Sequence, residues 1–356
     1  MSNSGFVTTQ ETEPAPTAAP SRPRRAPIVL LGLLGLYGAA LLAISAANAL
    51  GPERWWWSSL NLYLPQWIWA MPGAALVLGC LATRKTWRYS IVPVLLVAWV
   101  VGPLMGLRVH LAGEEAPTGA TRVRVMTWNL KWPRHRSPAS MRLIAAEHPD
   151  ILLLQDSDGA ADAVSRTLPG YTVEVYEQYV LATRFPVLTT GRYYGPSEEG
   201  HGKWLDGRLL INGTTVDVRC IHLTTPRPGL GALKHDFGEG GLTAFEGGNA
   251  IRLQQARVIA NRIARDSNPR IVAGDFNEPV QSLACRSIMD VGFRDAFDVA
   301  GMGYGYTYGD TLPVRQAFMR IDHVMASRDW RILACHTGPV DGSDHRPVVA
   351  DLALIK

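Results

Sequence analysis

Hydrophobic positions are distributed unevenly along the chain and divide it into two unlike parts. Between residues 27 and 110 lie three long apolar runs, at about 28–50, 62–82 and 90–108. An α-helix needs about 20 apolar residues to cross a bilayer. We therefore predict three transmembrane helices in this region, with a re-entrant or buried helix as the alternative for one of them.

The ends of these runs carry the residues that anchor and orient membrane helices. Aromatic residues, which favour the boundary between bilayer and water, crowd the ends at Trp55, Trp56, Trp57, Trp67, Trp69, Trp87 and Tyr89. Basic residues gather before the first run and between the second and third, at Arg22, Arg24, Arg25, Arg84, Lys85 and Arg88. Because basic loops stay in the cytoplasm, we predict a cytoplasmic N-terminus and an extracytoplasmic chain after the third helix. A cleaved signal peptide is the alternative interpretation of the first run.

The remaining sequence predicts a tail, a linker and one large soluble domain. Residues 1–26 are rich in Ser, Thr, Pro and Ala, which predicts disorder, and residues 111–120 are typical of a linker. From 121 to 356, strand patterns occur at about 123–128, 150–154, 216–223, 270–277, 320–327 and 346–354, and helical patterns at 140–147 and 249–265. Many strands with few helices predict an α+β sandwich with its site on one rim.

Composition limits the function classes in two ways. Residues 1–118 hold eight of the 35 Lys and Arg but only five of the 31 Asp and Glu, so the soluble domain is almost neutral. A neutral surface gives little support to a nucleic-acid substrate. Cys220, Cys285 and Cys335 show no zinc-site spacing, which leaves one disulfide among them or three free thiols as the alternatives.

Polar residues occur repeatedly where a predicted strand ends. They are Asn129, Asp156, His222, Asp275, Asn277, Asp322, Asp344 and His345. Taken one at a time, such residues are ordinary turn formers or structural histidines. As a set of carboxylates, amides and histidines at one rim, they suit a hard divalent cation with oxygen ligands, Mg²⁺ or else Mn²⁺.

The motifs TWN, LLLQD, HL, GDFN, RIDH and SDH, in this order across about residues 122–354, resemble the endonuclease/exonuclease/phosphatase superfamily. That superfamily includes DNase I-like nucleases, inositol polyphosphate phosphatases and neutral sphingomyelinases. The resemblance implies a four-layer α/β/β/α sandwich, here preceded by the three membrane helices. It also implies a Mg²⁺-dependent phosphoesterase.

The resemblance implies a role for each motif residue. Asn129, Asp156 and Asp344 would hold the metal ion. Asp275 would orient or deprotonate the attacking water, and Asn277 would position the water or the phosphate. His345 paired with Asp322 would contact the scissile phosphate, and His222 would donate to a phosphate oxygen.

Two departures from the family pattern and one long insertion qualify these roles. The family usually has Glu where this chain has Asp156, and Asp158 is a possible substitute ligand. In addition, Lys131 stands where some relatives carry an acidic residue. The segment 224–248 holds seven glycines, which predicts a mobile loop. It is either a surface insertion or a substrate-binding loop that brings Arg227, Lys234 and His235 to phosphate.

The sequence leaves three functions in competition. A membrane-anchored phosphodiesterase acting on nucleic acid is the first, and a phosphoesterase acting on phospholipid headgroups is the second. A non-catalytic binding domain is the third, because of Asp156. No feature of the sequence implies a protein partner.

Overall fold

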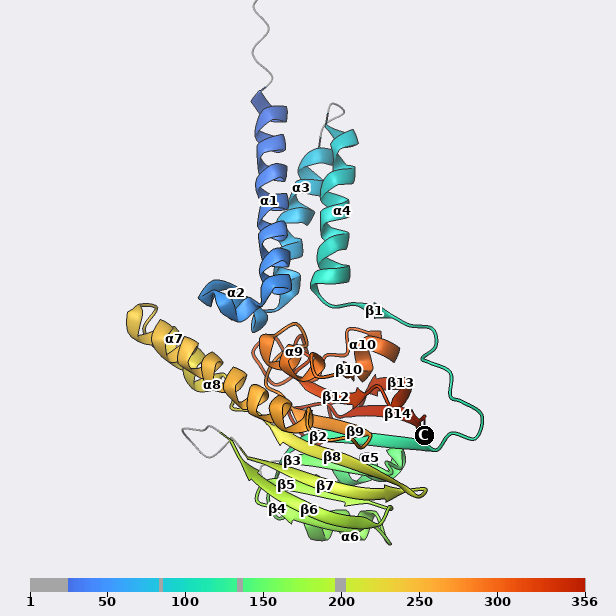
Figure 1. Cartoon of the computed structure of the whole chain (residues 1–356). Helices are drawn as coiled ribbons and strands as arrows, with labels where there is room; N and C mark the ends of the chain where they lie inside the picture. The colour runs from blue at the N-terminus through green and yellow to red at the C-terminus, as the bar shows by residue number, and fades with distance from the viewer. Residues whose placement is uncertain (1–24, 83–85, 133–136, 196–202, 356) are drawn as a thin grey trace, which may run out of the picture.

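The computed structural model describes residues 25–82, 86–132, 137–195 and 203–355. Within these residues a bundle of helices precedes one α+β domain (Figure 1). The predicted disordered tail lies outside the described residues except for its last two positions. Four of the basic residues on which the predicted orientation rests also lie outside the described residues. They are Arg22, Arg24, Arg84 and Lys85.

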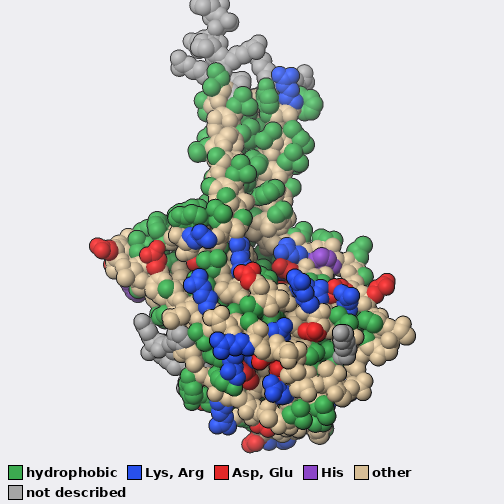
Figure 2. Space-filling model, viewed as in Figure 1, with side chains coloured by type: hydrophobic (Ala, Val, Ile, Leu, Met, Phe, Trp, Pro, Cys, Tyr) green, Lys and Arg blue, Asp and Glu red, His purple; other side chains and the backbone are tan. Residues whose placement is uncertain are grey.

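The N-terminal region consists of helical segments joined at bends. They are α1 (Arg25–Leu50), η1 (Pro52–Arg54), α2 (Trp56–Leu62), η2 (Gln66–Trp69), α3 (Ala70–Leu81), η3 (Trp87–Ser90), α4 (Ile91–Trp99) and η4 (Val100–Leu104). Two stretches, Ile28–Leu50 and Trp87–Leu104, are long and apolar enough to cross a membrane. Hydrophobic side chains cover these helices, whereas charged side chains lie over the domain (Figure 2).

The helix predicted over about 62–82 begins at Gln66 in the structure. Helix α2 ends at Leu62, and the helix that follows, Gln66–Leu81, is bent from it by 113°. Pro65 lies at the break, where it lacks a donor and disfavours helical geometry in the residue before it. The Asn61 amide donates to Gln66 Oε1 across the bend at 3.2 Å. The two helices Trp56–Leu62 and Gln66–Leu81 add a third candidate span only if together they cross a membrane as one unit.

The soluble domain contains two six-stranded sheets. The first has the order β13 (Trp330–Thr337), β14 (Val348–Leu354), β2 (Arg122–Trp132), β3 (Ile151–Ser157), β5 (Tyr179–Thr183) and β4 (Thr172–Tyr176). The second has the order β10 (Phe293–Asp295), β12 (Asp322–Ser327), β9 (Arg270–Asp275), β8 (Thr214–His222), β7 (Lys203–Ile211) and β6 (Val187–Tyr194). Strands β1 (Arg108–Val109) and β11 (Met302–Gly303) form a separate pair.

Alternating side chains build the layers on each side of the sheets. In β2, Val123 and Val125 enter the core between the sheets, while Met126 and Trp128 face the outer helices. Helices α5 (Pro138–Glu147) and α6 (Ala161–Thr167) cover the first sheet. Helices α8 (Glu239–Ile263) and α9 (Leu283–Met289) cover the second, with α7 (Arg227–His235) against α8 and α10 (Ala296–Ala300) against β13. The predicted four-layer sandwich is confirmed.

The prediction of a mobile loop over 224–248 is wrong, because the segment forms α7 and the first turns of α8. Its glycines serve close packing. A Cβ at Gly241 would lie 1.9 Å from the Asp236 carbonyl oxygen, and one at Gly229 would lie 2.9 Å from the Phe245 backbone. The two helices can approach only because these side chains are absent.

The helical bundle is bound to the domain at several points. Arg286 of α9 donates to the carbonyl of Ala49 at 2.6 Å, which satisfies an otherwise unpaired carbonyl at the end of α1. Tyr306 donates to the Met105 carbonyl, just after η4, at 3.1 Å. In the predicted linker, Glu114 binds Arg294 at 2.7 Å. The bundle and the domain are therefore docked against each other.

The cysteines are free. Cys220, Cys285 and Cys335 are buried without forming a disulfide. Of the two alternatives left open by the sequence, the structure has the three free thiols.

Candidate active site

The pairing of three neighbouring strands places three candidate residues side by side. His222 ends β8 and is in register with Asp275, which ends β9. Asp275 is in turn in register with Asp322, which begins β12. A Cβ at Gly274 would lie 1.9 Å from the Ile221 carbonyl oxygen, and its φ of +149° suits glycine. The glycine of GDFN therefore allows β8 and β9 to meet just before the two functional side chains.

The facing sheet contributes the remaining motif residues at the same rim. Asn129 of β2 donates from Nδ2 to Asp275 Oδ2 at 2.9 Å, which joins the two sheets. Asp156 near the end of β3 lies 3.4 Å from His222 Nδ1, measured to its Oδ1. Lys131, Asp156 and Asn277 all adopt positive φ angles, between 44° and 52°. Such backbone conformations in residues other than glycine concentrate at functional sites.

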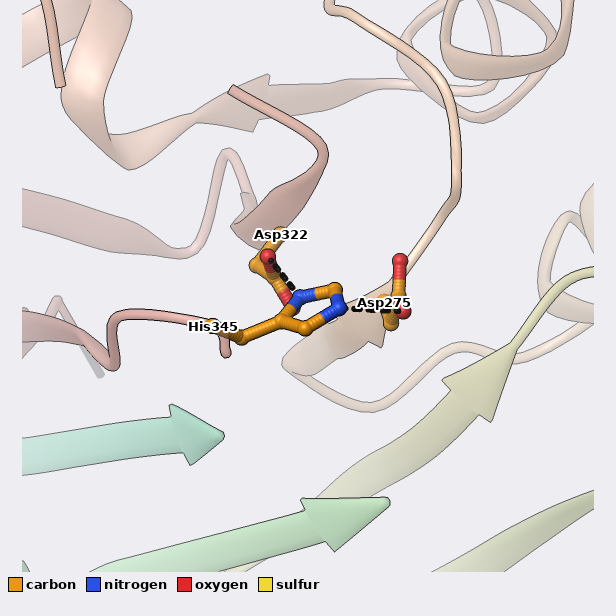
Figure 3. Close-up of side chains that lie close together, drawn as sticks. All are labelled: Asp275, Asp322 and His345. Atoms are coloured by element: carbon orange, nitrogen blue, oxygen red, sulfur yellow. Dashed lines mark hydrogen bonds and ion pairs between the residues drawn. The ribbon is translucent and has the colours of Figure 1, made fainter. Parts of the chain in front are cut away.

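His345 lies between two carboxylates at the centre of the site (Figure 3). Its Nδ1 is 2.9 Å from Asp322 Oδ2, and its Nε2 is 3.8 Å from Asp275 Oδ2. Burial disfavours the charged imidazole, but the charges of Asp322 and Asp275 outweigh burial and raise the pKa of His345 to about 9. At neutral pH, His345 is therefore a cation with one fixed orientation.

The segment that carries His345 is fixed by its neighbours. Ser343 donates to the Asn129 carbonyl at 2.6 Å and accepts the His345 backbone N–H at 3.1 Å. The Trp128 indole donates to the His345 carbonyl at 2.8 Å. The ring of Tyr308 lies 4.8 Å from the imidazole. These contacts hold the SDH motif against β2.

Asp275 is ionised and held in one orientation. Its Oδ2 accepts from Asn129, and its Oδ1 accepts the Asn277 backbone N–H at 2.8 Å. Burial alone would raise the pKa of Asp275, but the nearby charges of His345, His222 and Lys131 lower it below its usual range. A fixed carboxylate of this kind can orient a water molecule by accepting a hydrogen bond from it.

Asp156 is ion-paired with Lys131. The Lys131 ammonium group contacts Asp156 Oδ2 directly. Burial would raise the pKa of Asp156, but the hydrogen bond and charge of His222, together with Lys131, hold it well below its ordinary value. The proposed substitute ligand, Asp158, is exposed.

The donor set fits a divalent cation. Ligand atoms of Asp275, Asp322 and His345 lie within 4.8 Å of one another. Because a protonated His345 has no free lone pair, the carboxylates of this cluster are the groups that remain able to bind a cation. Asp322 Oδ1 and Asp344 Oδ1 are buried and have no hydrogen-bond partner among the described residues. Buried carboxylate oxygens without partners are costly unless a cation or water meets them.

The three candidate residues of the α7 region divide between the site and the surface. Arg227 reaches the site, where its guanidinium lies 3.5 Å from Asp344 Oδ2 and donates to the Tyr308 hydroxyl at 3.0 Å. Lys234 and His235 are exposed at the other end of α7, and the structure does not bring them to the site.

A family model described as "Endonuclease/Exonuclease/phosphatase family" matches residues 126–345. The chain belongs to this family. Family members are phosphoester hydrolases and generally depend on divalent metal ions. The buried Asp–His cluster is consistent with that chemistry. No curated protein matches the chain significantly.

Solved structures show the same fold at low sequence identity. An endonuclease/exonuclease/phosphatase from Bacteroides vulgatus has a TM-score of 0.51 and 20% identity, over 66% of this chain and 99% of that one. Truncated TDP2 from Caenorhabditis elegans has a TM-score of 0.51 and 19% identity, over 65% and 97%. A family protein from Bacteroides thetaiotaomicron has a TM-score of 0.50 and 15% identity, over 66% and 98%.

The sequence analysis did not identify three residues that contact the histidines of the candidate active site. Ser343 and Tyr308 position His345, and Gln178 Oε1 lies 2.9 Å from His222 Nδ1. Ser343 stands in the SDH motif and could have been found by its proximity to His345. Gln178 and Tyr308 come from segments without a strand-end pattern, so only the folded chain reveals them.

Proposed function

We propose that this protein is a membrane-anchored, Mg²⁺-dependent phosphodiesterase whose catalytic domain lies outside the cytoplasm. One observation carries the proposal: a cationic His345 lies between Asp322 and Asp275, beside Asn277, on the rim where both sheets end. That arrangement offers a fixed donor to a phosphate oxygen and a fixed acceptor for water in one place.

Each residue has a proposed part in the hydrolysis of the ester. Asp275 accepts a hydrogen bond from the attacking water and orients it toward phosphorus. His345 and His222 donate to phosphate oxygens as negative charge develops, and Asn277 positions the phosphate. Water attack forms a P–O bond while the P–O bond to the leaving group breaks. The proton lost by the water is balanced by the proton that the leaving alkoxide gains, so the products are an alcohol and a phosphomonoester.

Asn129, Asp156 and Asp344 are the proposed metal ligands. Among them, Asp344 presents a buried carboxylate oxygen without a hydrogen-bond partner. A bound Mg²⁺, or Mn²⁺, would neutralise phosphate charge that otherwise repels the nucleophile. Asp322 supports this chemistry indirectly, because its carboxylate orients the His345 ring.

Two substrate classes follow from this chemistry. Cleavage of nucleic acid is the first candidate, since two of the three activities in the family's name are those of nucleases. Hydrolysis of a phospholipid headgroup is the second, favoured by the docking of the helical bundle against the catalytic domain. The near-neutral charge of the domain counts against nucleic acid.

The chemistry is tested with bis(p-nitrophenyl) phosphate and the full-length protein in lipid nanodiscs. Turnover should require Mg²⁺, stop with EDTA, and fall by about 10²–10⁴-fold in His345→Gln, the usual contribution of a positioned proton donor. His336→Gln is the matched control, because His336 is an exposed histidine on β13. Absence of metal-dependent turnover with this ester, plasmid DNA and phospholipid vesicles would make the domain a binding module.

A further inference from the structure

A pocket of about 200 Å³ adjoins the catalytic residues. His345, Asn277, Thr225 and Arg227 contribute its polar lining, and its larger apolar lining includes Leu230, Leu312 and Ile321. The proposed mechanism uses only His345 and Asn277 of these residues. An apolar wall directly beside a phosphate-binding group requires an explanation, since phosphate itself gains nothing from it.

One wall of the pocket belongs to the membrane region. Tyr63, the residue that follows α2, lines the pocket. Its hydroxyl accepts from Arg252 of α8 at 3.0 Å, and its ring packs edge-on against Phe245 at 6.2 Å. Arg252 is itself buried and bound to Glu278, which follows the catalytic Asn277. The pocket is therefore fixed between the membrane region and the catalytic loop.

The surface next to this wall has the composition of a membrane interface. Trp55, Trp56 and Trp57 at the start of α2 are each more than a third exposed. Phe237, in the turn between α7 and α8, is 66% exposed and packs edge-on against Trp56 at 5.8 Å. Exposed aromatic side chains of this kind favour the boundary between lipid and water. Figure 2 shows hydrophobic side chains gathered where the helices meet the domain.

The size of the pocket limits what it holds. Complete ligand sites usually measure about 300–1,000 Å³. The pocket therefore accommodates part of a ligand, and the exposed aromatic surface at α2 is where the rest of an apolar ligand would enter a bilayer.

From these observations we propose that the pocket binds the apolar chain of a lipid phosphodiester that reaches the site from the bilayer. The phosphate lies on His345 and Asn277, the first carbons of the chain lie against Leu230, Leu312 and Tyr63, and the remainder stays in the membrane. This inference rests on the proposed phosphodiesterase activity and specifies its substrate class.

The test compares two soluble esters with the same leaving group, methyl and hexyl p-nitrophenyl phosphate. Full-length protein in nanodiscs with Mg²⁺ should show a kcat/KM at least about 30-fold higher for the hexyl ester, because each buried methylene contributes roughly fourfold. Leu312→Trp, which fills the pocket, should reduce the ratio to below about threefold. Val175→Trp is the control, because Val175 is exposed on β4, and it should leave the ratio unchanged.

Each outcome separates the two proposals. Equal kcat/KM values for the two esters in the wild-type protein would overturn the lipid proposal while leaving the phosphodiesterase in place. A hexyl preference that persists in Leu312→Trp reflects partition into the nanodisc and also overturns it. Cleavage of plasmid DNA together with equal ester values would assign the site to nucleic acid. Turnover of neither ester, nor of bis(p-nitrophenyl) phosphate, would remove the phosphodiesterase itself.

Discussion

At the scale of single residues, the charge of His345 depends on Asp322. The imidazole keeps its proton up to a pKa of about 9 because two carboxylates face it. The proposed active form is the protonated one, so kcat/KM should stay level through neutral pH and fall above about pH 9. Asp322→Asn removes the nearer of the two carboxylate charges, lowers the pKa of His345, and should move this descending limb to lower pH.

The measurement is a pH–rate profile of the wild-type and Asp322→Asn proteins with bis(p-nitrophenyl) phosphate. Asn keeps a similar shape and can still accept from the ring, which limits the change to charge. A descending limb at the same pH in both proteins would mean that another group controls it.

Lys131 offers a second prediction at this scale, because its ammonium group already neutralises Asp156. A metal ion at Asp156 must compete with that charge. Lys131→Gln should therefore tighten Mn²⁺ binding on the order of tenfold, since a unit charge about 4 Å away contributes about 1–4 kcal/mol between bulk water and a partly buried site. Titration of Mn²⁺ followed by electron paramagnetic resonance measures this without relying on turnover.

Lys234→Gln provides the control for the Lys131 experiment. It removes the same charge from an exposed position at the far end of α7, so Mn²⁺ affinity should stay unchanged. Unchanged affinity in Lys131→Gln as well would place the cation on the side of Asp275, Asp322 and Asp344, away from Asp156.

At the scale of elements, α8 connects the N-terminal helices to the loop after β9 through Arg252. This arginine binds Glu278 at 2.6 Å and the Tyr63 hydroxyl at 3.0 Å, and both it and Glu278 are 1% exposed. Arg252→Met leaves a buried carboxylate unpaired, so we expect a loss of about 3–5 kcal/mol in the free energy of unfolding. Because Tyr63 forms a wall of the pocket, the preference for the hexyl ester should fall too.

Thermal unfolding of the nanodisc-held protein measures this loss. Arg257→Met alters an exposed arginine on the same helix and should leave the transition within about 0.5 kcal/mol of wild type. The double variant Arg252→Met with Glu278→Met removes both charges and should recover part of the loss. A transition unchanged in Arg252→Met would mean that other contacts hold α2 in place.

The elements also show where sequence patterns succeed and where they fail. The sequence predicted His222, Asp275 and Asp322 because each is a polar residue at one end of an apolar strand pattern, although all three are buried in the structure. The register of β8, β9 and β12 aligns them. The bond from Asn129 to Asp275 joins two sheets, and no local pattern encodes it. The glycines in 224–248 suggested a mobile loop. A sequence alone does not distinguish a glycine that makes the backbone flexible from one such as Gly241, which lets α7 and α8 pack closely.

At the scale of the whole molecule, the number of membrane crossings follows from what the helix ends touch. Ala49, near the end of α1, accepts from Arg286, and Met105, after η4, accepts from Tyr306. Both helices therefore finish at the catalytic domain. If both cross the membrane, the chain must return between them, and the bent pair containing Gln66–Leu81 is the segment available. Hydropathy alone gives two clear spans, whereas docking favours three.

Three crossings and the distribution of basic residues predict that the catalytic domain lies outside the cytoplasm. Fusion of alkaline phosphatase to the C-terminus should be active, and fusion of green fluorescent protein there should be dark. The same reporters inserted after residue 85, in the basic loop between the second and third helices, should give the opposite result. A fluorescent C-terminal fusion would place the domain in the cytoplasm. The lipid phosphodiester would then have to come from the inner leaflet, because Tyr63, which follows α2, lines the pocket whichever side the domain occupies.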